Sequence, residues 1–196
     1  MAKSVVYIDG SNWYFKLKEL LSLNDKQPRV DFDVRGFCEQ LVGKDTLAGV
    51  NYYIGKLKRK RGNEKSEKLY AKQQKLIRHL QKQNVHIGFG HLISYPDGTH
   101  HEKGVDVLIA VEMIRFALDK KYGVAYLVSS DNDLVPAVKE VQRLGKKVVY
   151  VGSSIRKGQS FGLTSICDRT ILLQEKDVAP FLANDNTEQE NSDFLK

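Results

Sequence analysis

Cysteine is scarce in this sequence of 196 residues, and several other features are missing. The two cysteines, Cys38 and Cys167, make no spacing with each other or with histidine that is typical of a metal site. No apolar run approaches the roughly 20 residues that cross a bilayer, and the apolar segment ending at Asp9 is too short for a signal peptide. We therefore expect a reduced, cytoplasmic chain with no disulfide framework and no contact with a membrane.

Positive charge is in excess, with 31 Lys and Arg against 24 Asp and Glu. The excess is concentrated in one stretch, which holds Lys56, Lys58, Arg59, Lys60, Arg61, Lys65, Lys68, Lys72, Lys75, Arg78 and Lys82. A positive surplus favours an anionic partner, and nucleic acid is the commonest. A solvated helix face is the alternative for the part between Lys65 and Lys82.

Apolar runs with β-branched residues alternate with helical patterns along most of the chain. The runs predict strands at residues 3–8, 50–57, 85–95, 124–128, 147–151 and 171–173. Helices are predicted after a cap at Ser11 or Asn12, after Asp33, over 65–82, after Gly104, and around Pro136 up to Leu144-Gly145. In the helix after Gly104, we expect Val107, Leu108, Val111, Ile114 and Leu118 to face inward.

Strands that alternate with helices and are apolar on both faces predict an α/β fold. We expect a three-layer α/β/α sandwich around a mostly parallel sheet. One domain would occupy residues 1–183, and the polar, acidic segment 184–196 would form a flexible tail.

Four acidic residues stand where a parallel sheet places its ligands, beyond the carboxyl ends of the strands. Asp9 follows the first strand, Asp131 and Asp133 follow the strand 124–128, and Asp106 lies in the first turn after Gly104. Each alone could be a turn or helix-cap residue. Together they would repel one another unless a cation were bound, and oxygen ligands favour Mg²⁺ or Mn²⁺ over Zn²⁺.

Five segments carry a family resemblance. Tyr7–Asn12, Lys103–Val107, Val128–Asp133 and Leu144–Val148 occur in this order and are followed by Leu163–Arg169. Over about residues 3–174 the chain resembles the NYN domain family, in its LabA-like branch of the PIN-like nucleases. The resemblance implies a PIN-like, Rossmann-like sandwich and metal-dependent cleavage of RNA.

The resemblance also assigns roles to residues. It implies that Asp9, Asp106, Asp131 and Asp133 bind the metal, and that Asn12 and the Ser129-Ser130 pair support them or touch substrate phosphate. The chain departs from the family pattern at Ser130 and Asn132, where Gly is frequent, and at Glu112, where Asp is frequent. These departures remove no ligand, but they could narrow access to the site.

We therefore predict a ribonuclease that cleaves single-stranded RNA by attack of water, with Mg²⁺ or Mn²⁺ as cofactor. Lys103 would steady the phosphate, and Lys58, Arg59, Lys60 and Arg61 would bind RNA. A non-catalytic RNA-binding or regulatory module with the same fold and metal site is the main alternative. A small-molecule phosphohydrolase is a third reading, although Ser11 stands where the common haloacid-type signature has its second Asp.

Other features indicate less. Tyr52, Tyr53 and Tyr70 could stack on bases or belong to the framework. His100-His101 could take part in a zinc site, although adjacent residues of a strand point to opposite faces. A homodimer is a further expectation.

Overall fold

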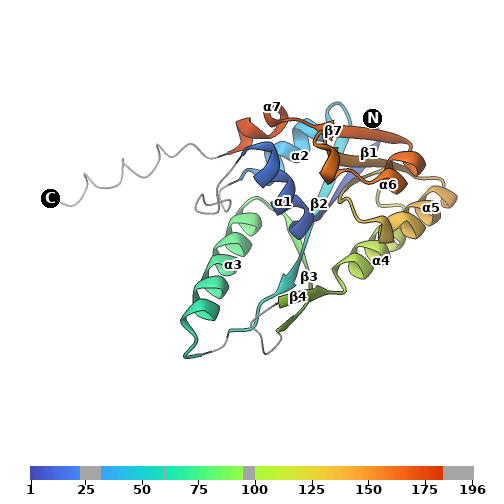
Figure 1. The fold of residues 1–196 in the computed structure, drawn as a ribbon. Helices are drawn as coiled ribbons and strands as arrows, with labels where there is room; N and C mark the ends of the chain where they lie inside the picture. The colour runs from blue at the N-terminus through green and yellow to red at the C-terminus, as the bar shows by residue number, and fades with distance from the viewer. Residues whose placement is uncertain (23–31, 60, 95–99, 183–196) are drawn as a thin grey trace.

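The computed structural model describes residues 1–22, 32–59, 61–94 and 100–182. A single sheet runs through the centre of the molecule (Figure 1). Its strands are β1 (Lys3–Asp9), β2 (Thr46–Lys56), β3 (His86–Ser94), β4 (His100–Lys103), β5 (Val124–Val128), β6 (Lys147–Ser153) and β7 (Arg169–Leu173). The sequence predicted all of these except β4, within a few residues at each end.

The strands lie in the order β4-β3-β2-β1-β5-β6-β7. Every neighbouring pair is parallel except β3 and β4. In the centre of the sheet, Asp9 lies beside Tyr53 of β2, and Ile8 lies beside Val128 of β5. The residues that follow β1 and β5 therefore emerge side by side at one rim, as the sequence predicted.

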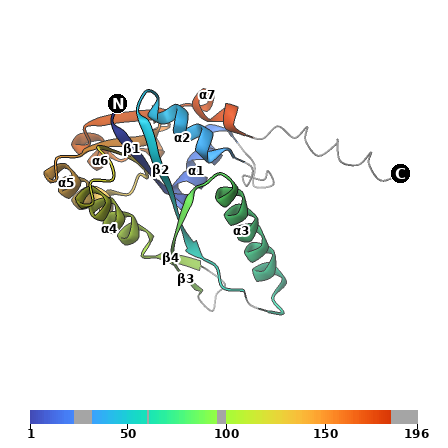
Figure 2. The same cartoon turned by 180° about the vertical axis from the view of Figure 1, so that it is seen from behind.

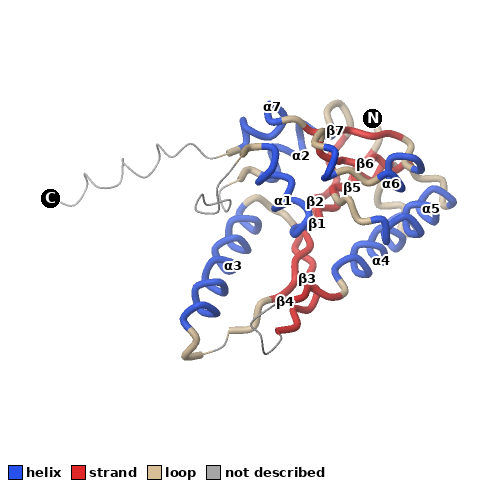
Figure 3. The backbone as a smooth tube through the Cα atoms, in the orientation of Figure 1, coloured by secondary structure: helices blue, strands red, loops and turns tan. Residues whose placement is uncertain are grey.

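Helices cover both faces of the sheet and form the outer layers of an α/β/α sandwich (Figures 1 and 2). One layer contains α1 (Gly10–Leu20), α2 (Val34–Val42), α3 (Glu64–Lys82) and α7 (Glu175–Val178). The other contains α4 (Val105–Leu118), α5 (Val135–Arg143) and α6 (Phe161–Ile166). The short 3-10 turns are η1 (Asn132–Leu134), η2 (Arg156–Gly158) and η3 (Ala179–Phe181). Figure 3 shows how these helices and turns connect the strands.

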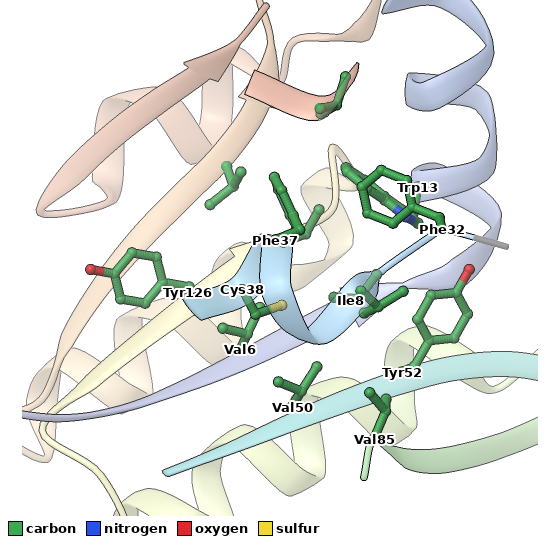
Figure 4. Close-up of a cluster of buried hydrophobic side chains, with 14 of the residues drawn as sticks. Val6, Ile8, Trp13, Phe32, Phe37, Cys38, Val50, Tyr52, Val85 and Tyr126 are labelled. Carbon is green, nitrogen blue, oxygen red and sulfur yellow. The ribbon is translucent and has the colours of Figure 1, made fainter. Parts of the chain in front are cut away.

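Alternate residues of β1 enter two separate cores, because successive side chains of a strand point to opposite faces. Val6 and Ile8 pack under α1 and α2, whereas Val5 and Tyr7 pack under α4 and α5. Figure 4 shows the first core, where the Trp13 ring approaches Phe37 with ring centroids 4.9 Å apart. The central strands β1, β5 and β6 are buried on both faces, as expected for a parallel sheet.

The start of α1 differs from the prediction. Asp9 is the N-cap, and its Oδ1 accepts the backbone N–H of Asn12 at 3.0 Å. The predicted caps, Ser11 and Asn12, therefore lie inside the helix. Gly10 permits this tight strand-to-helix passage, because a Cβ there would lie 2.7 Å from the Tyr53 carbonyl oxygen. The Asp33 cap of α2 was predicted and is confirmed.

The inward face of α4 was predicted correctly at Leu108 and Ile114, which pack against the second core, and wrongly at the other three positions. Val107, Val111 and Leu118 are 66%, 54% and 60% exposed. The buried residues of α4 are instead Val105, Ile109, Met113 and Ala117. This helix is apolar on most of its surface, so its periodicity allowed two stripes offset by two residues, and packing against the sheet selected the other one.

Some predictions concern residues outside the described part of the chain. These are Lys60, the acidic tail 184–196, and the turn at 95–98; the side chains of His100 and His101 also lie outside it. Among the described residues, no helix is both long and apolar enough to span a membrane.

Candidate functional site

Asp9 lies at the carboxyl end of β1 and is only 3% exposed. Its Oδ2 accepts hydrogen bonds from the Asn12 Nδ2 amide at 2.8 Å and from the Ser129 hydroxyl at 3.0 Å. With the Asn12 backbone N–H on Oδ1, three donors fix this carboxylate in one orientation. A carboxylate held this way remains able to accept further bonds, because each oxygen has two lone pairs.

Ser129 connects Asp9 to the acidic turn that follows β5. Its hydroxyl oxygen accepts the backbone N–H of Asp131 at 3.2 Å while its hydrogen goes to Asp9. Oδ1 of Asp131 then accepts the N–H of Asp133 at 2.9 Å and caps η1. Asp131 is half-buried, and the Asp133 side chain is exposed. The structure thus brings Asp9, Ser129, Asp131 and Asp133 to one rim in a single chain of contacts.

Asn12 occupies the centre of this site. Its Oδ1 accepts the backbone N–H of Ser130 at 3.1 Å and the Lys16 ammonium at 3.3 Å, while its Nδ2 donates to Asp9. Both ends of the amide therefore have partners. Asn12 links α1 to the turn after β5.

Lys16 is a residue of this site that the sequence analysis missed. It is only 3% exposed, and its Nζ donates to the Ser130 hydroxyl at 2.7 Å. Burial lowers the pKa of this ammonium to about 8, and the nearby carboxylates of Asp9 and Glu19 act in the opposite direction. A signal was available, because position 16 falls on the buried stripe of Trp13, Leu17 and Leu20.

Ser130 extends the network into the second half of the chain. Its hydroxyl donates to the Gly158 carbonyl and lies 3.1 Å from the Tyr150 hydroxyl, which in turn accepts the backbone N–H of Ser160. The Ser160 side chain donates to Asn132 at 2.6 Å. The side chains of Ser129 and Ser130 are thus engaged within the protein, which favours the supporting role over direct contact with phosphate.

Asp106 and Lys103 come from a more distant part of the rim. Lys103 ends β4 and is exposed, and Gly104, with φ +78°, turns the chain into α4. Val105 packs over Gly90 of β3, so α4 begins two strands away from β1. Asp106 is half-buried in the first turn of this helix.

Glu112, farther along α4, faces the sheet. Its Oε2 accepts the Tyr53 hydroxyl at 2.7 Å, and its Oε1 lies 3.6 Å from Arg115. This carboxylate therefore has partners within the protein fold.

The basic stretch covers the end of β2, the passage into α3 and α3 itself. Lys58, Arg59 and Arg61 are exposed, and Arg59 lies 3.3 Å from Glu67. The Gln73 side chain holds the passage to the helix, because it donates to the Gly55 carbonyl at 2.8 Å and accepts the Leu57 N–H at 2.9 Å. Lys58, Arg59 and Arg61 are thus displayed close to an anchored segment.

Aromatic side chains near this stretch differ in exposure. Tyr52 and Tyr53 are 5% and 0% exposed, so they belong to the framework rather than to a stacking surface. Phe89 of β3 is 38% exposed, with the Lys56 ammonium 5.6 Å from its ring centroid. The sequence analysis predicted a strand over this segment and assigned no role to Phe89.

The donor chemistry of the site fits a hydrated divalent ion. Among the described residues, no three or more His, Cys, Asp or Glu side chains are grouped so as to hold a metal. Mg²⁺ commonly retains several waters and uses only one or two carboxylates. Asp131 accepts at one oxygen only, and within the described part of the chain no donor contacts the Asp133 carboxylate. Oxygen atoms are therefore available next to the fixed Asp9.

Comparisons with known proteins identify the family of the chain. No curated protein matches the chain. A solved structure, a PLP-bound aminotransferase from Clostridium difficile 630, is similar over 86% of this chain with 11% identity and a TM-score of 0.30. The match covers about half of that protein, 48%, and it carries no argument about function. The model of the NYN domain matches residues 3–174. The chain therefore belongs to the NYN domain family, a PIN-like family of nucleases.

Proposed function

We propose that the protein is a metal-dependent ribonuclease that cleaves single-stranded RNA with water as the nucleophile. The observation that carries this proposal is the contact chain from Asn12 through Asp9 and Ser129 to Asp131, at the rim where parallel sheets bind ligands. Membership of the NYN family supports it independently. We further propose that the chain belongs to the LabA-like branch and acts in the cytoplasm.

In this proposal Asp9, Asp106, Asp131 and Asp133 are the acids that would hold Mg²⁺ or Mn²⁺, one or two of them by direct contact and the others through the waters that the ion retains. When bound, the ion supplies Lewis-acid chemistry for displacement at phosphorus. Asn12 and Ser129 orient the Asp9 carboxylate and so make it a fixed ligand. A carboxylate without such donors would be mobile and would bind the ion less well. Lys103, exposed at the end of β4, would contact a phosphate of the bound strand.

RNA would follow the basic stretch toward the acidic rim. Lys58, Arg59, Lys60 and Arg61 would bind phosphates, which gives affinity without a choice of sequence. The exposed Phe89 ring, with Lys56 beside it, offers a surface on which a base could stack. Extended, unpaired bases suit such a surface, and this supports single-stranded RNA as the substrate.

A binding or regulatory module is the second candidate. The contacts of Asp9 and Ser130 that fix the site also stabilise the strand ends, so a protein that binds RNA without cleaving it would retain them.

A homodimer stays a prediction, which sedimentation equilibrium would test.

Incubation of the purified protein with labelled single-stranded RNA tests the proposal. Cleavage is expected with Mn²⁺ or Mg²⁺ and not with EDTA. The Asp131→Asn variant should be inactive, and Asp119→Asn, which changes an exposed acid after α4, is the matched control. If wild type binds several RNAs with either metal and cuts none, the enzyme proposal is wrong and the binding module is favoured.

A further inference from the structure

We propose that Lys16 is a positioning residue of the acid site, which fixes the Asn12 amide against Asp9 and places a positive charge beside the carboxylates. Its link to catalysis rests on the proposed function. Its effects on the Asn12 amide can be measured without metal or RNA.

The first argument is the orientation of Asn12. The amide must present Nδ2 to the Asp9 carboxylate and Oδ1 to two donors, the Ser130 N–H and the Lys16 ammonium. A flipped amide would place an NH₂ group against both donors. Lys16 therefore opposes the flip, and the orientation that it favours is the one in which Asn12 donates to Asp9.

The second argument is the position of the ammonium between two elements. Lys16 joins Asn12 of its own helix to Ser130, which is 114 residues away along the chain. Ser130 in turn holds the Gly158 carbonyl and contacts Tyr150. Lys16 thus ties α1 to the turn after β5, and Asp9 and Asp131 flank that connection.

The third argument is the energetic cost of the arrangement. Lys16 lies on the buried stripe of α1, where Trp13, Leu17 and Leu20 are apolar. A buried ammonium is costly, and a well-packed apolar side chain of similar length is often more stable. A residue that served packing alone would therefore be better replaced by methionine. The contacts of Lys16 lead instead to the groups that orient Asp9.

The charge has a consequence for metal binding. Lys16 is close enough to Asp9 to interact with its carboxylate electrostatically. A fixed cation near a divalent ion opposes its binding, and removal of one such charge should tighten binding on the order of tenfold. Loss of the Asn12 contact alone would loosen the site and weaken metal binding, but Asp9 keeps the donors from the Asn12 N–H and Ser129, so we expect the effect of the charge to dominate.

The first experiment follows the Asn12 side-chain NH₂ signals by NMR without metal or RNA, with Asn12→Asp used for assignment. Lys16→Met should shift these signals and increase their exchange with solvent. The control Lys18→Met removes a lysine two positions along α1 and should leave them unchanged. If Lys16→Met is folded and leaves the Asn12 signals in place, the positioning role is overturned.

The second experiment titrates the apo protein with Mn²⁺ and follows the free ion by electron paramagnetic resonance. Lys16→Met should bind Mn²⁺ more tightly than wild type, whereas Lys16→Arg and Lys18→Met should bind like wild type. Equal or weaker binding of Mn²⁺ by Lys16→Met than by Lys18→Met would overturn the electrostatic role. A wild-type protein that binds no Mn²⁺ would contradict the proposed function, and the NMR result would then decide the role of Lys16 by itself.

Discussion

The Ser129 hydroxyl donates to Oδ2 of Asp9 at 3.0 Å and joins two residues that are 120 positions apart in the chain. Ser129 is completely buried, and the same oxygen accepts the N–H of Asp131. A single side chain thus sets the relative position of the acids that follow β1 and β5. This geometry distinguishes the two acids, because Asp9 is held by three donors and Asp131 by one.

Asp9→Asn and Asp131→Asn should both abolish metal-dependent cleavage but differ in stability. An amide at position 9 would turn an NH₂ group toward the donors of Asn12 or Ser129, which should lower the free energy of unfolding by about 1–3 kcal/mol. Asp131→Asn keeps an oxygen for the Asp133 N–H and should change it by less than about 0.5 kcal/mol. Urea unfolding and cleavage assays on both variants would measure this, and wild-type activity in both would exclude the proposed site.

The sequence predicted the elements of the fold better than their contacts. Strand alternation and the motif after β5 were sufficient to place Asp9 and Asp131 at one rim, because parallel strands end together. Phe89 was missed because its exposure depends on how far the neighbouring helices cover β3. Lys16 was missed because its burial depends on a distant acceptor, the Ser130 hydroxyl, which the local sequence does not reveal. The inward face of α4 was predicted only in part for a related reason, because an almost wholly apolar helix does not specify which side is buried.

Replacement of Lys58, Arg59 and Arg61 by Ala should weaken RNA binding similarly for all sequences. Binding releases fewer counterions from the RNA for each phosphate contact that is lost. The slope of log affinity against log salt should therefore become shallower by about 0.7 per contact. The control variant replaces Lys120, Lys139 and Lys147, which are exposed lysines away from this stretch. Fluorescence anisotropy between low and moderate salt would measure the slope. An unchanged slope in the first variant would place the RNA path elsewhere.

Lys16→Met should stabilise the apo protein at neutral pH. The pKa of Lys16 is about 8 in the folded chain against 10.5 ordinarily, so the unfolded chain binds more protons between these values and wild-type stability rises with pH across that window. Burial of the charged Lys16 ammonium lowers the free energy of unfolding, and this cost is fully present below about pH 8, where it is on the order of 3 kcal/mol. The groups that face Lys16 are Asp9, Glu19, Asn12, Ser130 and, through Ser130, Tyr150.

The measurement is the difference in free energy of unfolding between Lys16→Met and wild type at pH 7, 8, 9 and 10. The difference should favour Lys16→Met at pH 7 and shrink toward pH 10. Burial raises the pKa of Tyr7 and Tyr53 above its ordinary range, which lowers stability at high pH, but this affects both proteins equally. If the difference in free energy of unfolding were constant with pH, Lys16 would carry the same charge in the folded and the unfolded chain, which would contradict the prediction.

Asp106→Asn should separate a nuclease from a binding module. Asp106 lies in the first turn of α4, where a negative charge complements the helix dipole, so the change should cost at most about 1 kcal/mol of stability. In a nuclease its carboxylate helps to hold the metal, and its loss also reduces repulsion toward RNA. The variant should therefore bind single-stranded RNA at least as tightly as wild type and cut it orders of magnitude more slowly.

The matched control is Glu175→Gln, which changes an exposed first-turn acid of α7 and should alter neither RNA binding nor cleavage. A gel-shift titration and a cleavage time course on the same RNA, with Mn²⁺ and then with EDTA, would measure both effects. Weaker binding with unchanged cleavage would place Asp106 in RNA contact and remove it from the metal-binding acids.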